Sequence, residues 1–302
     1  MKPSFAPLHG LRILSLALNL PGPAALMRCR RMGAACTKLE PPTGDPMQHY
    51  RPEAYADLHE GVQVLEADLK TETGQAVLHR ELARTDVLLT SFRPSALDKL
   101  GLGWKSLHAR YPSLSQVAIV GAPGARAEEP GHDLTYLADN GLVHGLELPA
   151  TLYADMGGSL VASEAVLQAA LRKHERHDGG GDLHPEGLYL EGLYLEVALS
   201  DAAAYLGLPR RWGLTRPEGA VGGAHAGYRV YRCKDGRVAV AALEPHFARA
   251  LCEAAGFATS DRQVMLAPAT REAVAAFLAG QTCEQLERLA VEKDIPLHAM
   301  RD

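Results

Sequence analysis

Short apolar runs recur through the first 120 residues, and each is followed by a segment with helix-forming composition. The runs occupy residues 11–18, 34–39, 86–90 and 115–120, and the helical segments between them occupy residues 24–32, 73–83 and 104–110. Runs of this length suit buried strands, and turn residues such as Pro21-Gly22-Pro23 end the first one. Strands that alternate with helices predict βαβ units and a mostly parallel sheet.

The middle of the chain predicts a long helix followed by a surface loop. Residues 157–174 are rich in Ala and Leu, and residues 177–182 then form a glycine-rich break. The pentapeptide at residues 187–191 repeats at once at residues 192–196. Two copies of five residues are far too few for a repeat architecture, so we interpret them as a local duplication.

The last 80 residues predict a smaller unit of a different kind. Asp235-Gly236 separates two β-prone runs at residues 228–232 and 237–240, which is a strong hairpin signal. Helical patterns follow at residues 247–255, 273–278 and 283–291. We therefore expect a large Rossmann-like α/β domain with a linker helix at residues 1–222 and a small α+β domain at residues 223–302.

Charge and cysteine content exclude several classes of protein. With 31 basic and 36 acidic residues the formal net charge is -5, which gives no basic field for nucleic acid or an anionic membrane. Five scattered cysteines without a C-x-x-C spacing argue against a disulfide framework and fit a reducing compartment. There is no apolar run of about 18 residues, and prolines interrupt the N-terminus, so we expect neither a membrane span nor a signal peptide. The expected location is the cytoplasm.

Several common site motifs are missing from the sequence. It contains no G-x-G-x-x-G, no P-loop and no G-x-S-x-G element. His174, His177 and His184 have a spacing that zinc could use, but they lie in a charged, glycine-rich stretch. A solvated loop explains them better, and we predict no metal site.

Three places carry residues suited to chemistry, although each also has a simpler interpretation. His132 lies in Gly131-His132-Asp133, past a predicted strand, where ligands of α/β sheets bind. Asp155 precedes Gly157-Gly158 and a helix; it is suited to a cap or a first-turn charge, and the glycines indicate a close approach of backbone to something. Glu244, between an apolar strand and a helix, is likewise suited to a cap.

Taken in order, the motifs of the chain resemble those of family III CoA-transferases (CaiB/BaiF). The resemblance runs from about Leu8 to the C-terminus. Its motifs are Leu20-Pro21-Gly22-Pro23, Lys38-Leu39-Glu40-Pro41-Pro42, Gly44-Asp45-Pro46-Met47, Ala67-Asp68-Leu69-Lys70, Thr85-Asp86-Val87-Leu88, Phe92-Arg93-Pro94, Leu100-Gly101-Leu102-Gly103, Gly131-His132-Asp133-Leu134-Thr135-Tyr136, Ala154-Asp155-Met156-Gly157-Gly158 and residues 228–247.

The resemblance implies a Rossmann-like large domain, a smaller domain and two chains interlocked as a homodimer. It implies that Asp155 is the carboxylate shared by CoA-transferases and α-methylacyl-CoA racemases, and that in transferases this group carries the acyl chain as a mixed anhydride. His132 and Glu244 match the racemase branch, in which Glu244 comes from the partner chain. A base and an acid on opposite faces of the α-carbon suit racemisation. A histidine titrates near neutrality, and an aspartate reaches that range if burial or a neighbouring carboxylate such as Glu244 raises its pKa.

The same resemblance implies that coenzyme A enters as part of the substrate, with no tightly bound cofactor. It assigns contacts with the CoA ester to Arg93, Gly131, His132, Asp133 and Tyr136. The first hypothesis is a racemase acting on a 2-methylacyl-CoA thioester. Two alternatives stay open, namely CoA transfer from an acyl-CoA to a carboxylic acid through Asp155, and a divergent paralogue without catalysis. The acyl chain and the acceptor are not identifiable from the sequence.

Three departures from the family pattern bear on CoA binding. Residues 58–63 include Glu60 where relatives carry cations for the CoA phosphates, which leaves Arg93, Arg28, Arg30 and Arg31 as candidate cations. The loops at residues 121–124 and 145–152 are shorter than in relatives, so we expect an altered acyl pocket. The sequence ends at Asp302, and relatives continue for several tens of residues, so we expect a weakened dimer or exposed apolar surface.

Overall fold

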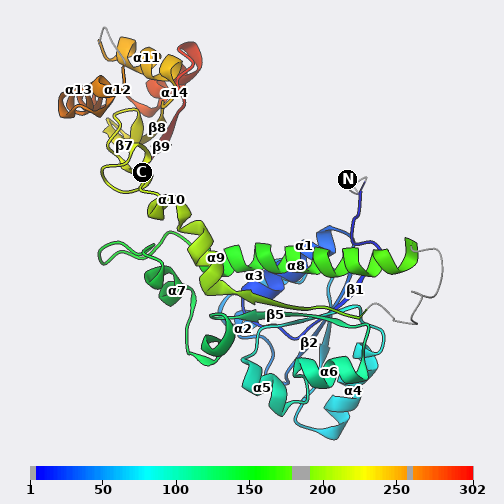
Figure 1. The fold of residues 1–302 in the computed structure, drawn as a ribbon. Helices are drawn as coiled ribbons and strands as arrows, with labels where there is room; N and C mark the ends of the chain where they lie inside the picture. The colour runs from blue at the N-terminus through cyan, green and yellow to red at the C-terminus, as the bar shows by residue number, and fades with distance from the viewer. Residues whose placement is uncertain (1–4, 179–190, 257–260, 302) are drawn as a thin grey trace. The chain divides into compact units, whose positions relative to one another are not determined.

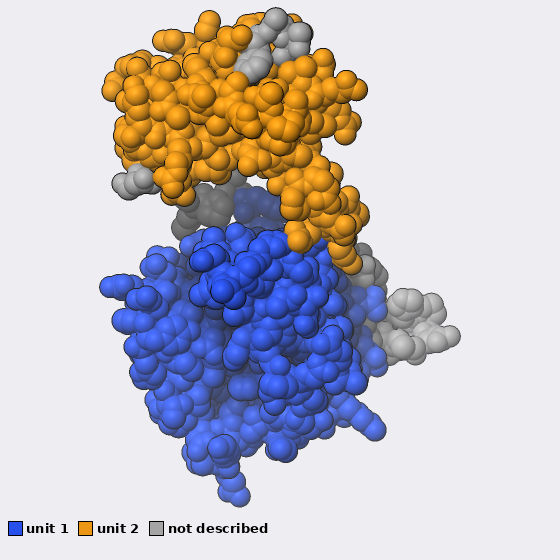
Figure 2. Space-filling view, turned by 90° about the vertical axis from the view of Figure 1, so that its left-hand side faces the viewer, with its two compact units in different colours: residues 1–207 blue, residues 208–302 orange. Residues whose placement is uncertain are grey.

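The computed structural model describes residues 5–178, 191–256 and 261–301, except for the side chains of residues 174–178. The chain divides into two compact units, Met1–Gly207 and Leu208–Asp302, which Figure 2 shows in blue and orange. Each unit is described by itself below. The domain boundary expected after residue 222 stays a prediction.

The first unit is built around a six-stranded sheet in which all neighbouring strands are parallel. The spatial order is β3-β2-β1-β4-β5-β6, so the chain changes direction across the sheet between β1 and β4. This arrangement confirms the predicted α/β class with a mostly parallel sheet. The strands are β1 (Arg12–Ser15), β2 (Ala35–Glu40), β3 (Gln63–Glu66), β4 (Val87–Thr90), β5 (Ser115–Val120) and β6 (Tyr194–Ala198).

Helices cover both faces of this sheet (Figure 1). Side chains alternate between the faces along each strand, so Val87 and Leu89 of β4 join one buried cluster and Leu88 joins the other. The first cluster includes residues of α1 (Pro21–Arg31), α7 (Asp133–Asp139), α8 (Tyr153–Asp178) and α9 (Leu199–Leu206). The second includes residues of α4 (Glu72–Leu82), α5 (Pro94–Lys99) and α6 (Trp104–Arg110). Double coverage explains why these strands are apolar on both faces.

Helix α8 packs along α1, and several alanines of α8 are buried in a cluster that both helices join. Ala162, Ala165, Ala169 and Ala170 are buried in the cluster that α8 shares with α1, and their spacing places them on one face of the helix. Arg28 of α1 reaches across this contact, where its Nε donates to Ser163 Oγ at 3.1 Å. The position of α8 therefore depends on its packing against α1.

In the first unit, two strands and several short helices are additions to the sequence-based prediction. Strand β3 lies at one edge of the sheet, and three of its four residues are exposed, which explains its weak apolar pattern. Strand β6 contains part of the second pentapeptide copy, whereas residues 187–190 lie outside the described residues, as does most of the predicted glycine-rich loop. The unpredicted short helices are α2 (Pro46–Tyr50), α3 (Pro52–Leu58), the 3₁₀ turn η1 (Gly124–Glu128), α5, α7 and α9.

The second unit contains a three-stranded antiparallel sheet in the order β7-β8-β9. Strands β7 (Tyr228–Cys233) and β8 (Gly236–Ala241) form the predicted hairpin, and β9 (Leu297–Arg301) adds an unpredicted third strand. Val238 and Val240 of β8 pack with buried residues of the surrounding helices. The helices are α10 (Leu208–Arg211), the 3₁₀ turn η2 (Ala220–Gly222), α11 (Pro245–Ala254), α12 (Arg262–Leu266), α13 (Pro268–Ala279) and α14 (Cys283–Glu292). Among the described residues of the chain, no helix is long and apolar enough to cross a membrane.

Candidate active site

A cavity of about 810 Å³ opens in the first unit, beyond the carboxyl ends of the central strands. Its lining includes the segments that follow β1, β4 and β5, which are the strands at and beside the point where the strand order reverses. Ligands of open α/β sheets bind at this kind of position. Arg93, Gly131, His132, Asp133, Tyr136 and Asp155 all belong to the lining. The structure therefore gathers the residues that the sequence placed in the large domain around one cavity.

Asp155 is the third residue of α8, so it is a first-turn carboxylate and not the N-cap. Its backbone N–H donates to Asp133 Oδ1 at 3.0 Å. Asp133 begins α7 and is almost fully buried, with 4% of its surface exposed. This hydrogen bond joins the starts of two helices, and it fixes the backbone of Asp155 beside the cavity.

Burial raises the pKa of Asp155 from its ordinary value of 3.8 to about 6. The neighbouring Asp133 carboxylate raises this pKa further, and His132 opposes the shift. A carboxyl group with a pKa near 6 can both take up and release a proton near neutral pH, as an acid–base catalyst must. His132 lies close enough to act on the charge of Asp155.

The backbone of His132 is held by a local hydrogen-bond loop. Its N–H donates to Thr135 Oγ1 at 3.1 Å, and this hydroxyl donates back to the His132 carbonyl at 2.8 Å. His132 occupies the N-cap position of α7, and its side chain is exposed in the cavity lining. The loop therefore directs the start of α7 without burying the imidazole.

Tyr136 lies between two glycines of the cavity wall. A Cβ atom at Gly121 would come within 2.2 Å of the Tyr136 hydroxyl, and one at Gly131 would come within 2.6 Å of the ring. Glycine at both positions makes room for this buried ring. Burial raises the pKa of Tyr136, Asp155 raises it further, and Arg93 lowers it. These three side chains therefore share one electrostatic environment.

The glycine pair after Asp155 has a packing role. A Cβ at Gly158 would lie 2.2 Å from a methyl carbon of Leu199, and one at Gly157 would lie 3.1 Å from Leu206. Both neighbours belong to α9. The close approach expected from the sequence therefore occurs, and its partner is helix α9.

The cations at the cavity differ in part from those that the sequence suggested. Arg28, Arg30 and Arg31 are absent from the described lining. Arg28 bonds to Ser163, and Arg30 pairs with Glu60 at 3.2 Å, so Glu60 is neutralised by a neighbour. The lining instead contains Arg51 together with Arg93. Arg51 joins α2 to α3 and is the first arginine or lysine after the Gly44-Asp45-Pro46-Met47 motif, which is the signal that could have revealed it.

Glu244 belongs to the second unit and occupies the N-cap position of α11. Its side chain forms no capping hydrogen bond within the described part of the chain. A capping role therefore does not explain this carboxylate, although its backbone begins the helix. The expected place of Glu244 beside an Asp155 carboxylate stays a prediction.

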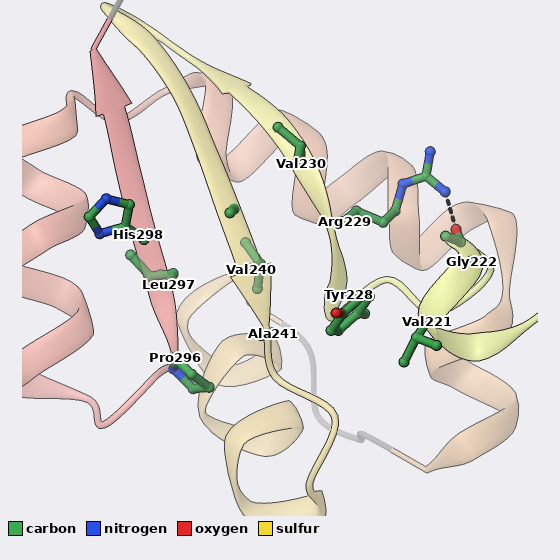
Figure 3. Close-up of a pocket in the computed structure, with 12 residues that line it drawn as sticks. Val221, Gly222, Tyr228, Arg229, Val230, Val240, Ala241, Pro296, Leu297 and His298 are labelled. Atoms are coloured by element: carbon green, nitrogen blue, oxygen red, sulfur yellow. Dashed lines mark hydrogen bonds between the residues drawn. The ribbon is translucent and has the colours of Figure 1, made fainter. Parts of the chain in front are cut away.

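The second unit has a hollow of about 670 Å³ over its small sheet (Figure 3). Val221, Tyr228, Val230 and Leu297 supply apolar surface, and Arg229 donates to the Gly223 carbonyl at one side. No carboxylate belongs to the described lining of this hollow. It therefore lacks the paired acid and base groups of the first cavity.

Potential metal ligands also come together outside the cavity. The thiols of Cys233 and Cys283 lie 3.6 Å apart near Asp235, whose Oδ1 accepts from the Cys283 N–H at 2.7 Å. Burial raises the pKa of the Cys283 thiol to about 11, so it is protonated at neutral pH. The side chains of His174, His177 and His184 lie outside the described residues.

The chain belongs to CoA-transferase family III, whose family model matches residues 8–302. It is 28% identical over 270 residues to the probable fatty acyl-CoA transferase of Mycobacterium tuberculosis, covering 82% of this chain and 68% of that one. It is 29% identical over 264 residues to the α-methylacyl-CoA racemase of Mus musculus, covering 84% of this chain and 66% of that one. The chain thus spans about two thirds of the length of these relatives.

A solved structure supports the fold assignment. A CaiB/BaiF family protein from Brucella suis superposes with a TM-score of 0.78 at 24% identity. The match covers 99% of this chain and 85% of the Brucella chain. The expected family III fold, with its parallel α/β part and its small antiparallel sheet, is therefore confirmed.

Proposed function

We propose that this chain is a racemase-type enzyme that removes and returns the α-proton of a 2-methylacyl-CoA thioester. One observation carries the proposal: Asp155, with a pKa of about 6, lies with His132 at a single cavity. Removal of the α-proton by one group gives an enolate, and protonation by the other on the opposite face inverts the carbon. Because each group can take up or release a proton, the two roles exchange with the direction of reaction.

The cavity lining supports a thioester as the ligand. Arg51 and Arg93 are cations that can bind the phosphates of coenzyme A, and Leu20, Leu134 and Leu152 offer apolar surface to an acyl chain. In this proposal Gly131, Asp133 and Tyr136 shape the wall against the ester. Coenzyme A enters as part of the substrate, and no further cofactor is needed for proton transfer.

The proposal extends to the assembly. Glu244 is a carboxylate without a capping bond, and we assign it to the active site of a partner copy in an interlocked homodimer. Mixing His132→Ala with Glu244→Gln subunits tests this directly. Activity should reappear in the mixed dimer, since one of its two sites then has all three wild-type side chains. No recovery after subunit exchange would rule out this arrangement. The cytoplasm is the location proposed for the enzyme.

A second function, CoA transfer, is favoured by the access of Asp155 to the cavity. One carboxylate oxygen would attack the thioester carbonyl and expel the CoA thiolate, which leaves an acyl–aspartyl anhydride. The thiolate would then attack the aspartyl carbonyl, release the acyl group as a free carboxylate and leave a CoA thioester of Asp155. An acceptor carboxylate would repeat these steps in reverse and leave as a new acyl-CoA. His132 would only polarise or position the ester.

One experiment separates the two functions. The protein is incubated with a 2-methylacyl-CoA in D₂O, with and without a free carboxylic acid. Deuterium at the α-carbon, measured by mass spectrometry, supports proton exchange, whereas new acyl-CoA that requires the acceptor supports transfer. If neither product forms and calorimetry detects no CoA binding, both enzymatic hypotheses are wrong. The alternative of a non-catalytic paralogue is then supported.

A further inference from the structure

A lysine is buried completely beside the cavity. Lys38 lies in β2 with 0% of its surface exposed, and it is among the largest fully buried side chains in the described part of the chain. Its Nζ lies 2.5 Å from Asp45 Oδ2, 2.9 Å from Glu40 Oε1 and 2.9 Å from His59 Nε2. An ammonium group has three protons to donate, so these three acceptors use all of them.

The surrounding hydrogen bonds show that Lys38 is the charged member of this group. His59 Nδ1 lies 2.7 Å from the Tyr55 carbonyl, which can only accept, so Nδ1 bears the ring proton and Nε2 accepts from Lys38. Burial and the Lys38 charge lower the pKa of His59, which keeps its ring neutral. Glu40 Oε1 also accepts from the Tyr55 hydroxyl at 3.0 Å. The ammonium thus occupies the position that a metal ion would take among Glu40, Asp45 and His59.

Asp45 connects this buried cation to the cavity wall. Its carboxylate accepts from the Asn19 N–H at 3.1 Å and from the Met47 N–H at 2.9 Å. Asn19 has a φ of 63°, a left-handed conformation that costs a non-glycine residue energy unless its surroundings hold it. Tyr50 donates to Asn19 Oδ1 at 3.3 Å, and Asn19, Met47 and Tyr50 all line the cavity.

We propose that Lys38 is a positioning residue for the CoA thioester site, acting through Asp45 on the Asn19 turn and on the start of α2. Without the ammonium, two buried carboxylates face each other, and one of them must become protonated or move. Either change weakens the acceptor that holds the Asn19 N–H. The turn then relaxes from its left-handed conformation, and the wall beside Arg51 shifts. The identity of the ligand rests on the proposed function. The positioning role of Lys38 rests on its hydrogen bonds through Asp45 to Asn19.

Two pairs of variants test the proposal. Lys38→Met should raise the KM for an acyl-CoA about tenfold or more, with kcat within about threefold, because the site is displaced while its acid and base remain. Asn19→Ala should raise KM in the same direction, whereas Asn19→Gly should stay near wild type, since glycine adopts this φ freely. Glu81→Gln is the matched control. Glu81 is a buried carboxylate of α4 that pairs with Arg84, and it is absent from the described cavity lining.

Hydrogen exchange gives a reading that does not require activity. In Lys38→Met the amides of Asn19 and Met47 should exchange faster than in wild type, and in Glu81→Gln they should not. If Lys38→Met leaves both KM and this exchange unchanged, or if Asn19→Ala matches Asn19→Gly, the positioning role is wrong. If Lys38→Met does not fold, the Asn19 pair decides. If wild type binds no acyl-CoA, the proposed function fails, and exchange alone decides the role of Lys38.

Discussion

The two units each contain a hollow of similar size, but the linings differ in kind. The cavity of the first unit, about 810 Å³, combines Asp155, His132 and two arginines, whereas the described lining of the second hollow, about 670 Å³, includes Arg229 and His298 but no carboxylate. A parallel sheet brings the carboxyl ends of several strands, with their loops, to one edge. An antiparallel hairpin instead spreads side chains over a face. The topology of the sheet therefore decides where acid and base groups come together. The volume of a cavity alone would not identify the candidate active site.

Loss of the central carboxylate should have the largest effect. Asp155→Asn should lower α-proton exchange and CoA transfer at least about a thousandfold, because both functions use this oxygen. Exchange in D₂O and acceptor-dependent transfer are the measurements. Asp139→Asn, at an exposed position on α7, serves as the control. Substantial activity in Asp155→Asn would show that the catalytic centre does not lie in the first cavity.

Loss of the imidazole should separate the two functions. His132→Ala should lower α-proton exchange about a hundredfold, since a general acid or base contributes on this scale. Transfer should fall less than about tenfold if the ring only positions the ester. The two rates are measured on one preparation. Equal losses in both assays would show that this division of roles is mistaken.

The raised pKa of Asp155 should appear in the pH dependence of stability. Because burial raises this pKa from 3.8 to about 6, the native state holds the proton more tightly than the unfolded state does. The free energy of unfolding should therefore fall as pH rises from about 4 to about 7, by up to about 3 kcal/mol. Urea unfolding at both ends of this window measures the change. Asp155→Asn should lack this contribution, and a difference from wild type that does not vary with pH would contradict the assignment.

A matched pair of substitutions compares the hollows directly, with the smallest expected effect. Arg51→Ala should weaken CoA binding about tenfold, as loss of one charge-assisted contact to a phosphate does at an exposed position. Val230→Ser, at a residue that is 58% exposed in the second hollow, should leave binding within about twofold. Calorimetry with coenzyme A measures both. A loss in Val230→Ser as large as that in Arg51→Ala would mean that the second hollow takes part in binding.

The sequence predicted the sheet where burial leaves a plain pattern. Strands β1, β4 and β5 are covered on both faces, so they appear as continuous apolar runs. Strand β3 lies at the edge of the sheet and is mostly exposed. Strand β6 pairs with β5, and the two strands are far apart in the sequence. Such strands depend on tertiary contacts that local composition does not reveal.

The candidate site was predictable in its motifs and not in its electrostatics. His132 and Asp155 follow from the order of motifs, and both line one cavity. Arg51 was missed because it lies between two short helices that have little periodicity. In the sequence Lys38 was noted only as part of a motif. Its burial was not predicted, because a charged residue in a strand is normally exposed. Its burial arises from three partners that only the folded chain brings together.

The packing of α8 against α1 makes the position of Asp155, the proposed catalytic carboxylate, sensitive to residues outside the cavity lining. Asp155 lies in the first turn of α8, which packs along α1, and Ala165 lies about 15 Å further along this helix. A larger side chain there would push α8 along or away from its neighbour and carry Asp155 with it. Random mutagenesis should therefore yield inactive variants with substitutions where α8 packs on α1. Directed evolution can use the same positions to change the placement of Asp155 without altering the cavity lining.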